Sequence, residues 1–279
     1  MFRVKNMSKA DFEFAVDITD QMGWGLAKQD FEFMLEIEPK GSFVLLEDSE
    51  RIGIATTVSF GKVGWFGNLI VNQNKRNRGA GSLLVKHATE YLAGKHVETI
   101  GLYAYMERVH FYRSLGFECD SEFVVLKGKS HSSPAKTNVR KTTKKDLERV
   151  ISFDGACFGA SREKLLKPIL LDPDNLCYEY VENGEILGYA TAKVYRGLAE
   201  LGPLAFNKRK TKAAIELLKA TLNELDGLEV SMFAPREETQ ILAMLKKDGF
   251  RESFKVQTMF YGPPITRSCI YMAESLERG

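Results

Sequence analysis

The sequence has 279 residues, of which 44% are hydrophobic and 27% charged, a composition typical of a soluble globular protein with one or two domains. Its 39 basic and 37 acidic side chains leave a net charge of +2, which excludes the strongly basic character of a nucleic-acid-binding protein. No apolar run reaches membrane-spanning length and no basic-then-apolar signal pattern opens the chain, so we expect a cytoplasmic protein without a membrane partner. The four cysteines have neither metal-ligand nor disulfide spacing, so we expect reduced thiols and no metal site.

The elements of the first 128 residues mix helices and strands. Ser8 is placed to cap a first helix. Strands are predicted where β-branched and aromatic residues gather, over residues 41–48, 51–60, 64–71 and 97–103. A helix between the last two has one apolar stripe, formed by Leu83, Leu84, His87, Ala88, Tyr91 and Leu92, and Gly94 is placed to end it. A short helix over 108–115, ended by Gly116, and a closing strand or hairpin over 117–128 complete the order.

Four segments recur in the same order at an almost constant offset. The segments VKNMSKADFE from Val4 and VRKTTKKDLE from Val139 match at an offset of 135, as do FVLLEDSERIGIATT from Phe43 and YEYVENGEILGYATA from Tyr178. Two later pairs match at offsets of 134 and 133. We therefore interpret the chain as a tandem duplication, with domains over residues 1–128 and 139–279 and a polar linker over 129–138.

A glycine-rich turn joins the strand over 64–71 to the helix that follows. It contains Arg76, Asn77, Arg78, Gly79, Ala80, Gly81 and Ser82. Free N–H groups at a helix start attract anions, and glycines let the backbone approach them closely. The spacing is neither that of the P-loop nor that of the dinucleotide-binding fingerprint. The pattern therefore predicts a phosphate-binding loop of another kind; the alternative is a turn that only caps a core helix.

The loop resembles motif A of the GNAT acyltransferase superfamily, [R/Q]-x-x-G-x-[G/A], which here runs from Arg76 to Gly81. Downstream, FYRSLGF from Phe111 is similar to motif B of that family. The resemblance implies an α/β (α+β) fold with two tandem GNAT-like domains. Each would be a mixed, mostly antiparallel, twisted sheet with splayed central strands and flanking helices.

The resemblance also implies a mechanism. Acetyl-CoA would lie between the splayed strands, with its pantetheine paired to the backbone of Leu69, Ile70 and Val71 and its pyrophosphate on the amides of Arg78 to Ser82. An amine would attack the thioester directly, and Tyr112, in the family's general-acid position, would protonate the leaving thiolate. The base that takes the amine's proton stays open among four glutamates, Glu32, Glu36, Glu38 and Glu107.

Several of these side chains have a structural alternative. Tyr112 and its neighbour Phe111 would also suit the packing face of a short helix. His87, on the apolar stripe, is interpreted as a core residue. Trp24 and Trp65 would either line an acceptor pocket or pack in a core.

The second copy lacks the residues of the anion site. Aligned on the helix, Arg76 falls on Lys210, Gly79 on Ala213 and Gly81 on Ile215; aligned on the GF turn, Tyr112 falls on Leu245. Side chains at the glycine positions would block a close backbone approach. We therefore expect a degenerate second domain that folds like the first and does not bind CoA.

An active GNAT domain followed by a degenerate one resembles a tandem group of the family. The resemblance rests on MGWGLAKQDFEFMLEIEPKGSFV from Met22, GYATAKVYRGLAELGPL from Gly188 and the ending RSCIYMAESLERG. Some members of that group acylate small amines, and the second domain is placed to complete the acceptor pocket.

These patterns predict an N-acetyltransferase that uses acetyl-CoA and the primary amine of a small molecule. The rival hypothesis is a non-catalytic acyl-CoA sensor or scaffold. A protein acetyltransferase is less favoured, because no acidic cluster suggests a groove for a basic peptide. A homodimer is compatible with the sequence.

Overall fold

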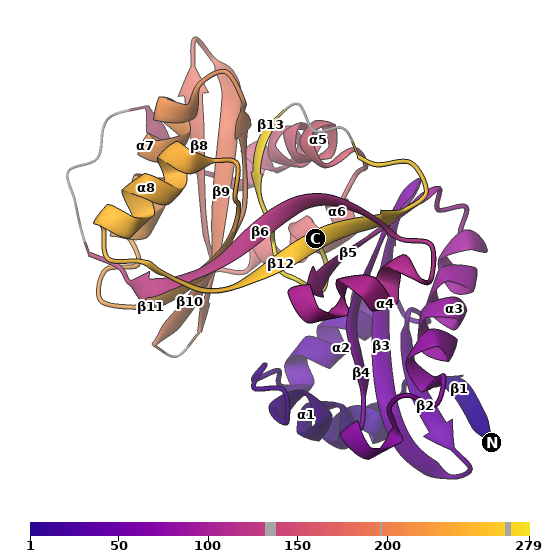
Figure 1. The fold of residues 1–279 in the computed structure, drawn as a ribbon. Coiled ribbons are helices and arrows are strands. Elements are labelled where there is room, and N and C mark those ends of the chain that lie inside the picture. Colours follow the sequence, from indigo (N-terminus) through magenta and orange to yellow (C-terminus); the bar gives the residue numbers. More distant parts are fainter. Residues whose placement is uncertain (132–137, 196, 266–268) are drawn as a thin grey trace.

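The computed structural model describes residues 1–131, 138–195, 197–265 and 269–279 (Figure 1). Residues 132–137, most of the predicted linker, lie outside these ranges. The helices are α1 (Phe12–Asp20), α2 (Lys28–Ile37), α3 (Ala80–Ala93), α4 (Val109–Arg113), α5 (Leu147–Phe158), α6 (Glu163–Leu171), α7 (Thr211–Asn223) and α8 (Thr239–Lys247). Within the described ranges, no helix is long and apolar enough to span a membrane.

The predicted strands occur in the predicted order, and the structure adds a first strand, β1, and a helix, α2, that the patterns did not assign. Those of the first half are β1 (Phe2–Asn6), β2 (Ser42–Glu47), β3 (Glu50–Phe60), β4 (Val63–Val71), β5 (Thr99–Tyr105) and β6 (Glu118–Lys129). Those of the second half are β7 (Val139–Lys141), β8 (Leu176–Glu182), β9 (Glu185–Tyr195), β10 (Leu198–Asn207), β11 (Glu229–Pro235), β12 (Arg251–Tyr261) and β13 (Cys269–Met272).

A single sheet runs through both halves. Its strand order is β1-β2-β3-β4-β5-β12-β6-β11-β10-β9-β8-β7, with β13 paired to β10. Among the strand pairs of the described residues, only β4–β5 and β10–β11 are parallel. The mixed, mostly antiparallel α/β arrangement with one unit per repeat is therefore confirmed.

β6, the last strand of the first half, and β12, its counterpart in the second half, each pair with the other half. β12 lies between β5 and β6, with Val256 opposite Tyr105 and Tyr261 opposite Ile100. β6 in turn pairs with β11, from Phe123 opposite Pro235 to Lys129 opposite Glu229. Figure 1 shows β6 and β12 crossing together between the halves. Residues 118–129 therefore form a strand as predicted but do not close a sheet of their own, because the repeats have exchanged β6 and β12.

The parallel pair in each half separates after a few residues. β4 and β5 pair only from Val63–Thr99 to Trp65–Gly101, and β10 and β11 only from Leu198–Glu229 to Leu201–Met232. Beyond these points the strands diverge, which confirms the predicted splay. The splay between β4 and β5 opens toward α3, and the splay between β10 and β11 opens toward α7.

Alternating side chains of the strands are buried on both faces. In β2, Phe43 and Leu45 pack with α3, whereas Val44 and Leu46 pack with α1 and α2. In the second half, Leu217, Leu218 and Leu222 of α7 cover one face of the sheet. The opposite face, under α5 and α6, shares one core with α2 and Trp65 of the first half. The two halves therefore meet through a hydrophobic core as well as through the sheet.

The exchanged strands predict that the first half is not an independent folding unit. A chain ending at Ser130 lacks β11 and β12, so the exposed edge of β5 and both edges of β6 lose their partners. We expect this truncated chain to aggregate or to lack a cooperative thermal transition, whereas the full chain unfolds cooperatively. Circular dichroism and size-exclusion chromatography measure both properties. A folded, monomeric 1–130 chain would show that β6 can pair with β5 directly.

Candidate active site

The predicted phosphate loop starts α3 with two left-handed residues. Asn77 has a φ of 61° and Gly79, the N-cap of α3, has a φ of 81°. The carbonyl of Gly79 accepts the amide of Leu83 at 3.0 Å. In the described structure, the amides of Arg78 to Ser82 donate no hydrogen bond to the chain. The loop therefore presents a run of free N–H groups, as an anion site requires.

Gly81 is needed for helix packing as well. A Cβ at this position would lie 3.3 Å from the Phe111 ring of α4, so the glycine lets motif B pack against the first turn of α3. Gly79 has open space around it and is required by its positive φ instead. The two positions of the motif thus require glycine for different physical reasons.

The side chains of the two loop arginines contact other residues of the first half. Arg76 Nε donates to the carbonyl of Val71 at 2.8 Å, which ties the loop to the end of β4. Arg78 forms an ion pair with Glu47 at 2.6 Å and lies over the Phe2 ring. Both guanidiniums are therefore engaged elsewhere in this conformation. Backbone N–H groups are the main donors that the loop offers to an anion.

The splayed part of β4 has one paired edge and one open edge. Its residues 70 and 71 pair with β3, and a register shift occurs at Asn68, whose φ is 50°. Asn68 Nδ2 donates to Thr56 Oγ1 at 3.2 Å, which holds this bulge. No described strand pairs with the other edge of residues 66–71. Leu69, Ile70 and Val71 therefore present backbone groups to the first splay.

The second splay is filled by the chain itself. β13 pairs antiparallel with β10, from Leu204 opposite Met272 to Asn207 opposite Cys269. At the repeat offset of 135, Leu204, Ala205 and Phe206 correspond to Leu69, Ile70 and Val71. The strand thus occupies the edge where the first half has its open backbone groups.

The loop before α7 also differs from the loop before α3. α7 begins at Thr211, so Ala213, aligned with Gly79, lies inside its first turn. The amides of Ala213 and Ala214 both donate to the carbonyl of Lys210, whose side chain forms an ion pair with Glu182. The second half therefore has no matching run of free amides at this place.

Tyr112 is buried, with 8% of its surface exposed. Its ring packs against Phe66 of β4 and against Phe117, with centroids 6.4 and 5.8 Å apart. Among the described residues, its hydroxyl has no hydrogen-bond partner. Burial raises the pKa of Tyr112, with a smaller opposing effect of Arg108. The hydroxyl thus keeps its proton at neutral pH and is available as a donor.

Glu38, one of the four candidate bases, is fully engaged. Its carboxylate accepts Tyr91 Oη at 2.6 Å, the amide and hydroxyl of Ser59 at 2.9 and 2.8 Å, and Lys164 Nζ at 2.5 Å. Although burial opposes ionisation, these bonds lower the pKa of Glu38 to about 2. It is therefore an anion that joins α2 to α6 and not a base for neutral pH. The other three, Glu32, Glu36 and Glu107, are exposed.

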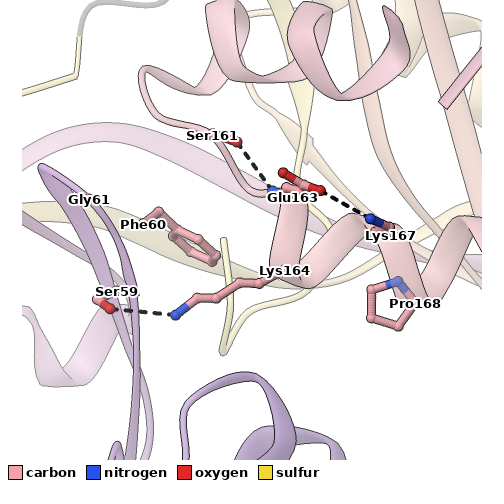
Figure 2. A pocket seen from close by; sticks show the side chains of 8 residues that line it. All are labelled: Ser59, Phe60, Gly61, Ser161, Glu163, Lys164, Lys167 and Pro168. Carbon is pink, nitrogen blue, oxygen red and sulfur yellow. Dashed lines mark hydrogen bonds and ion pairs between the residues drawn. The ribbon is translucent and has the colours of Figure 1, made fainter. Parts of the chain in front are cut away.

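A pocket of about 490 Å³ lies beside this anchor, between the end of β3 and α6. Figure 2 shows Lys164 extending from α6 to Ser59, with the Phe60 ring beside it. The pocket borders the start of β4, where β4 and β5 are paired. It therefore lies at the closed end of the splay, away from the phosphate loop.

Residues 273–279, here called the tail, reach both splays. A Cβ on Gly202 of β10 would meet the Ala273 carbonyl, and a Cβ on Gly67 of β4 would lie 2.5 Å from Glu277 Cα. Trp65 Nε1 donates to the Leu276 carbonyl at 3.3 Å, which confirms a packing role for this indole. Trp24, by contrast, is half-buried and bonds Tyr105 Oη at 2.9 Å. The ending RSCIYMAESLERG contributed to the resemblance with the tandem group, but the sequence patterns gave the tail no role in the site, because its partners lie far away in the chain.

The Glu38 anchor predicts a pH-dependent contribution to stability. Because its pKa falls from 4.5 unfolded to about 2 folded, the contribution is complete above pH 4.5 and is lost as the pH falls toward 2. We expect Glu38→Gln to lower the free energy of unfolding at pH 7 by about 2 kcal/mol. Urea titrations at several pH values measure this, with the exposed Glu36→Gln as control. A difference that does not narrow at acidic pH would contradict the assignment.

Comparison with known proteins places both halves in one family. Residues 8–117 match the acetyltransferase (GNAT) family, and residues 150–271 match an acetyltransferase (GNAT) domain. A curated relative, holothin acyltransferase of Pseudoalteromonas sp. (strain SANK 73390), is 24% identical over 262 residues, which cover 92% of this chain and 87% of the relative.

Solved structures show the same fold over the whole chain. A putative acetyltransferase from Pyrococcus horikoshii has a TM-score of 0.83 at 20% identity, over 100% of this chain and 96% of the other. A tandem GNAT protein from the clavulanic acid biosynthesis pathway has a TM-score of 0.64 at 12% identity, over 95% and 100%. With a GNAT domain in each half and a run of free amides at the start of α3, the chain belongs to the GNAT acyltransferases, in their tandem form.

Proposed function

We propose that the first half transfers an acetyl group from acetyl-CoA to the primary amine of a small molecule. The observation that carries this proposal is the open edge of residues 66–71 beside the free amides of residues 78–82. An extended pantetheine chain can pair with such an edge while its pyrophosphate accepts hydrogen bonds from the amides. The second half offers neither feature, so we propose that it does not bind CoA.

The small-molecule acceptor is supported by the relatives. One of them is named for acylation of holothin, and another belongs by its title to the clavulanic acid pathway. The non-catalytic sensor is less favoured, because the matched families are acetyltransferases in both halves.

In the proposed reaction the amine nitrogen attacks the thioester carbonyl, a C–N bond forms, and the C–S bond breaks. Backbone N–H groups on the open edge near Ile70 or Val71 are suited to stabilise the oxyanion. Tyr112 would donate a proton to the sulfur from the α4 side. Because the pKa of Tyr112 is raised, full transfer of its proton to a thiolate is unfavourable in the unliganded site. The main contribution of Tyr112 is then a hydrogen bond from its hydroxyl to the sulfur.

Calorimetric titration of acetyl-CoA into the full chain tests the binding part of the proposal. We expect one site per chain. Gly79→Ala forces an L-residue into the left-handed region at a cost of about 1–2 kcal/mol, so the Kd should rise roughly tenfold. Gly184→Ala is the matched control, because Gly184 has a φ of 83° and open surroundings in the second half. Two sites, or an equal effect of both substitutions, would contradict the assignment to the first splay.

Tyr112→Phe separates an enzyme from a sensor. We expect kcat with a primary amine to fall about 100-fold while the Kd for acetyl-CoA is unchanged. Tyr261→Phe is a suitable control, because Tyr261 also packs against Phe117 but is 45% exposed. Unchanged turnover in Tyr112→Phe would leave Tyr112 as a core residue, and no thiol release by the wild type with any amine would support the sensor.

A further inference from the structure

The tail lies against the first splay at the residue just before the bulge. The Cα, Cβ and carbonyl oxygen of Glu277 are 2.5, 2.6 and 2.7 Å from the place a Cβ on Gly67 would take. Gly67 precedes Asn68, where the register of β3 and β4 shifts. The backbone and Cβ of Glu277 therefore lie at the inner end of the splay, next to the backbone groups proposed to bind the acyl donor.

The face of the sheet on which Glu277 lies is the face left for the acceptor. Phe66 packs with α3 and with Tyr112 of α4, so the next residue, Gly67, points to the opposite face. The anion loop and the motif B tyrosine belong to the α3 face. If the donor enters from that side, the amine must reach the thioester carbonyl from the side of Gly67.

Glu277 belongs to a buried cluster with one surplus carboxylate. Lys193 of β9 pairs with Glu274 of the tail at 2.5 Å and with Glu200 of β10 at 2.7 Å. Arg278 pairs with Glu274 at 2.9 Å and with Glu277 at 2.8 Å. Three carboxylates thus face two cations, and no side chain in the cluster exposes more than 22% of its surface. A bound ammonium group would balance this charge.

We infer that Glu277, which the tail brings from the second half, receives the proton that the attacking amine loses. This inference rests on the proposed function. The ammonium group gives one proton to the Glu277 carboxylate, which frees the lone pair of the nitrogen. The lone pair forms the C–N bond, the C–S bond breaks, and the second proton that the nitrogen loses ends on the leaving sulfur. The acceptor class that fits is a small primary amine that carries a positive charge at neutral pH.

The surroundings of Glu277 suit a base. Burial raises its pKa, and the carboxylates of Glu200 and Glu274 act in the same direction, whereas Arg278 and Lys193 oppose them. A base is most effective when its pKa approaches the working pH, whereas Glu38 is held far below it. Because the base must be ionised, its contribution should be lost as the pH falls below the raised pKa of Glu277.

The experiment measures thiol release from acetyl-CoA by the full chain, with 2-phenylethylamine, other primary alkylamines and aniline as acceptors. We expect Glu277→Gln to lower kcat/KM for the alkylamine used best by about 100-fold, to remove an acidic limb of the pH profile, and to leave the Kd for acetyl-CoA unchanged. Aniline is uncharged at neutral pH, so any turnover of it should fall much less.

Glu200→Gln is the matched control, because it removes a carboxylate from the same cluster but not from the face of β4. We expect it to raise KM for the alkylamine and to retain kcat. Thermal unfolding of both variants checks the fold, and Arg278 keeps Glu274 as its partner in Glu277→Gln. Equal pH profiles for Glu277→Gln and wild type would overturn this inference alone, whereas no thiol release by the wild type with any amine would overturn the proposed function and the inference with it.

Discussion

β5 forms backbone hydrogen bonds along one edge with β4 for only three residue pairs, and along the other edge with β12 from the far end of the chain. The first contact is too short to hold β5 alone, so β12 holds it in the sheet. Since the position of β5 sets one wall of the first splay, the cleft proposed for acetyl-CoA depends on a strand of the second half. The hydrophobic core under α2, α5 and α6 strengthens the same junction.

The two halves use the same splay in different ways. In the first, the diverging edge of β4 is open and lies beside free amides. In the second, β13 supplies the hydrogen bonds that a pantetheine chain would otherwise supply, and the tail amide of Ala273 adds one to Phe233 of β11. An unpaired edge in a buried place is costly, so a splay without a ligand is stabilised when the chain fills it. The filled splay supports the proposal that the second copy does not bind CoA, as do Ala213 and Ile215 at the positions of the two glycines.

Much of this could be predicted from the sequence. The repeat, the strands around residues 41–71, the apolar stripe of α3 and the left-handed Gly79 all follow from local patterns, and the structure has each of them. The strand exchange could not be predicted, because β6 and β12 are copies of one element and each satisfies the hydrophobic pattern of either place. The role of the tail was hidden for another reason. Glu277 and Gly67 are 210 residues apart, and no periodicity links them.

The exchange also sets the order in which the protein can mature on the ribosome. The edge of β5 is synthesised long before residues 251–261, its partners in β12. At about 5–20 residues per second, the roughly 120 residues between the end of β6 and the start of β12 take about 6–24 s to translate. During that time the nascent first half carries an unsatisfied strand edge, open to wrong partners in neighbouring chains.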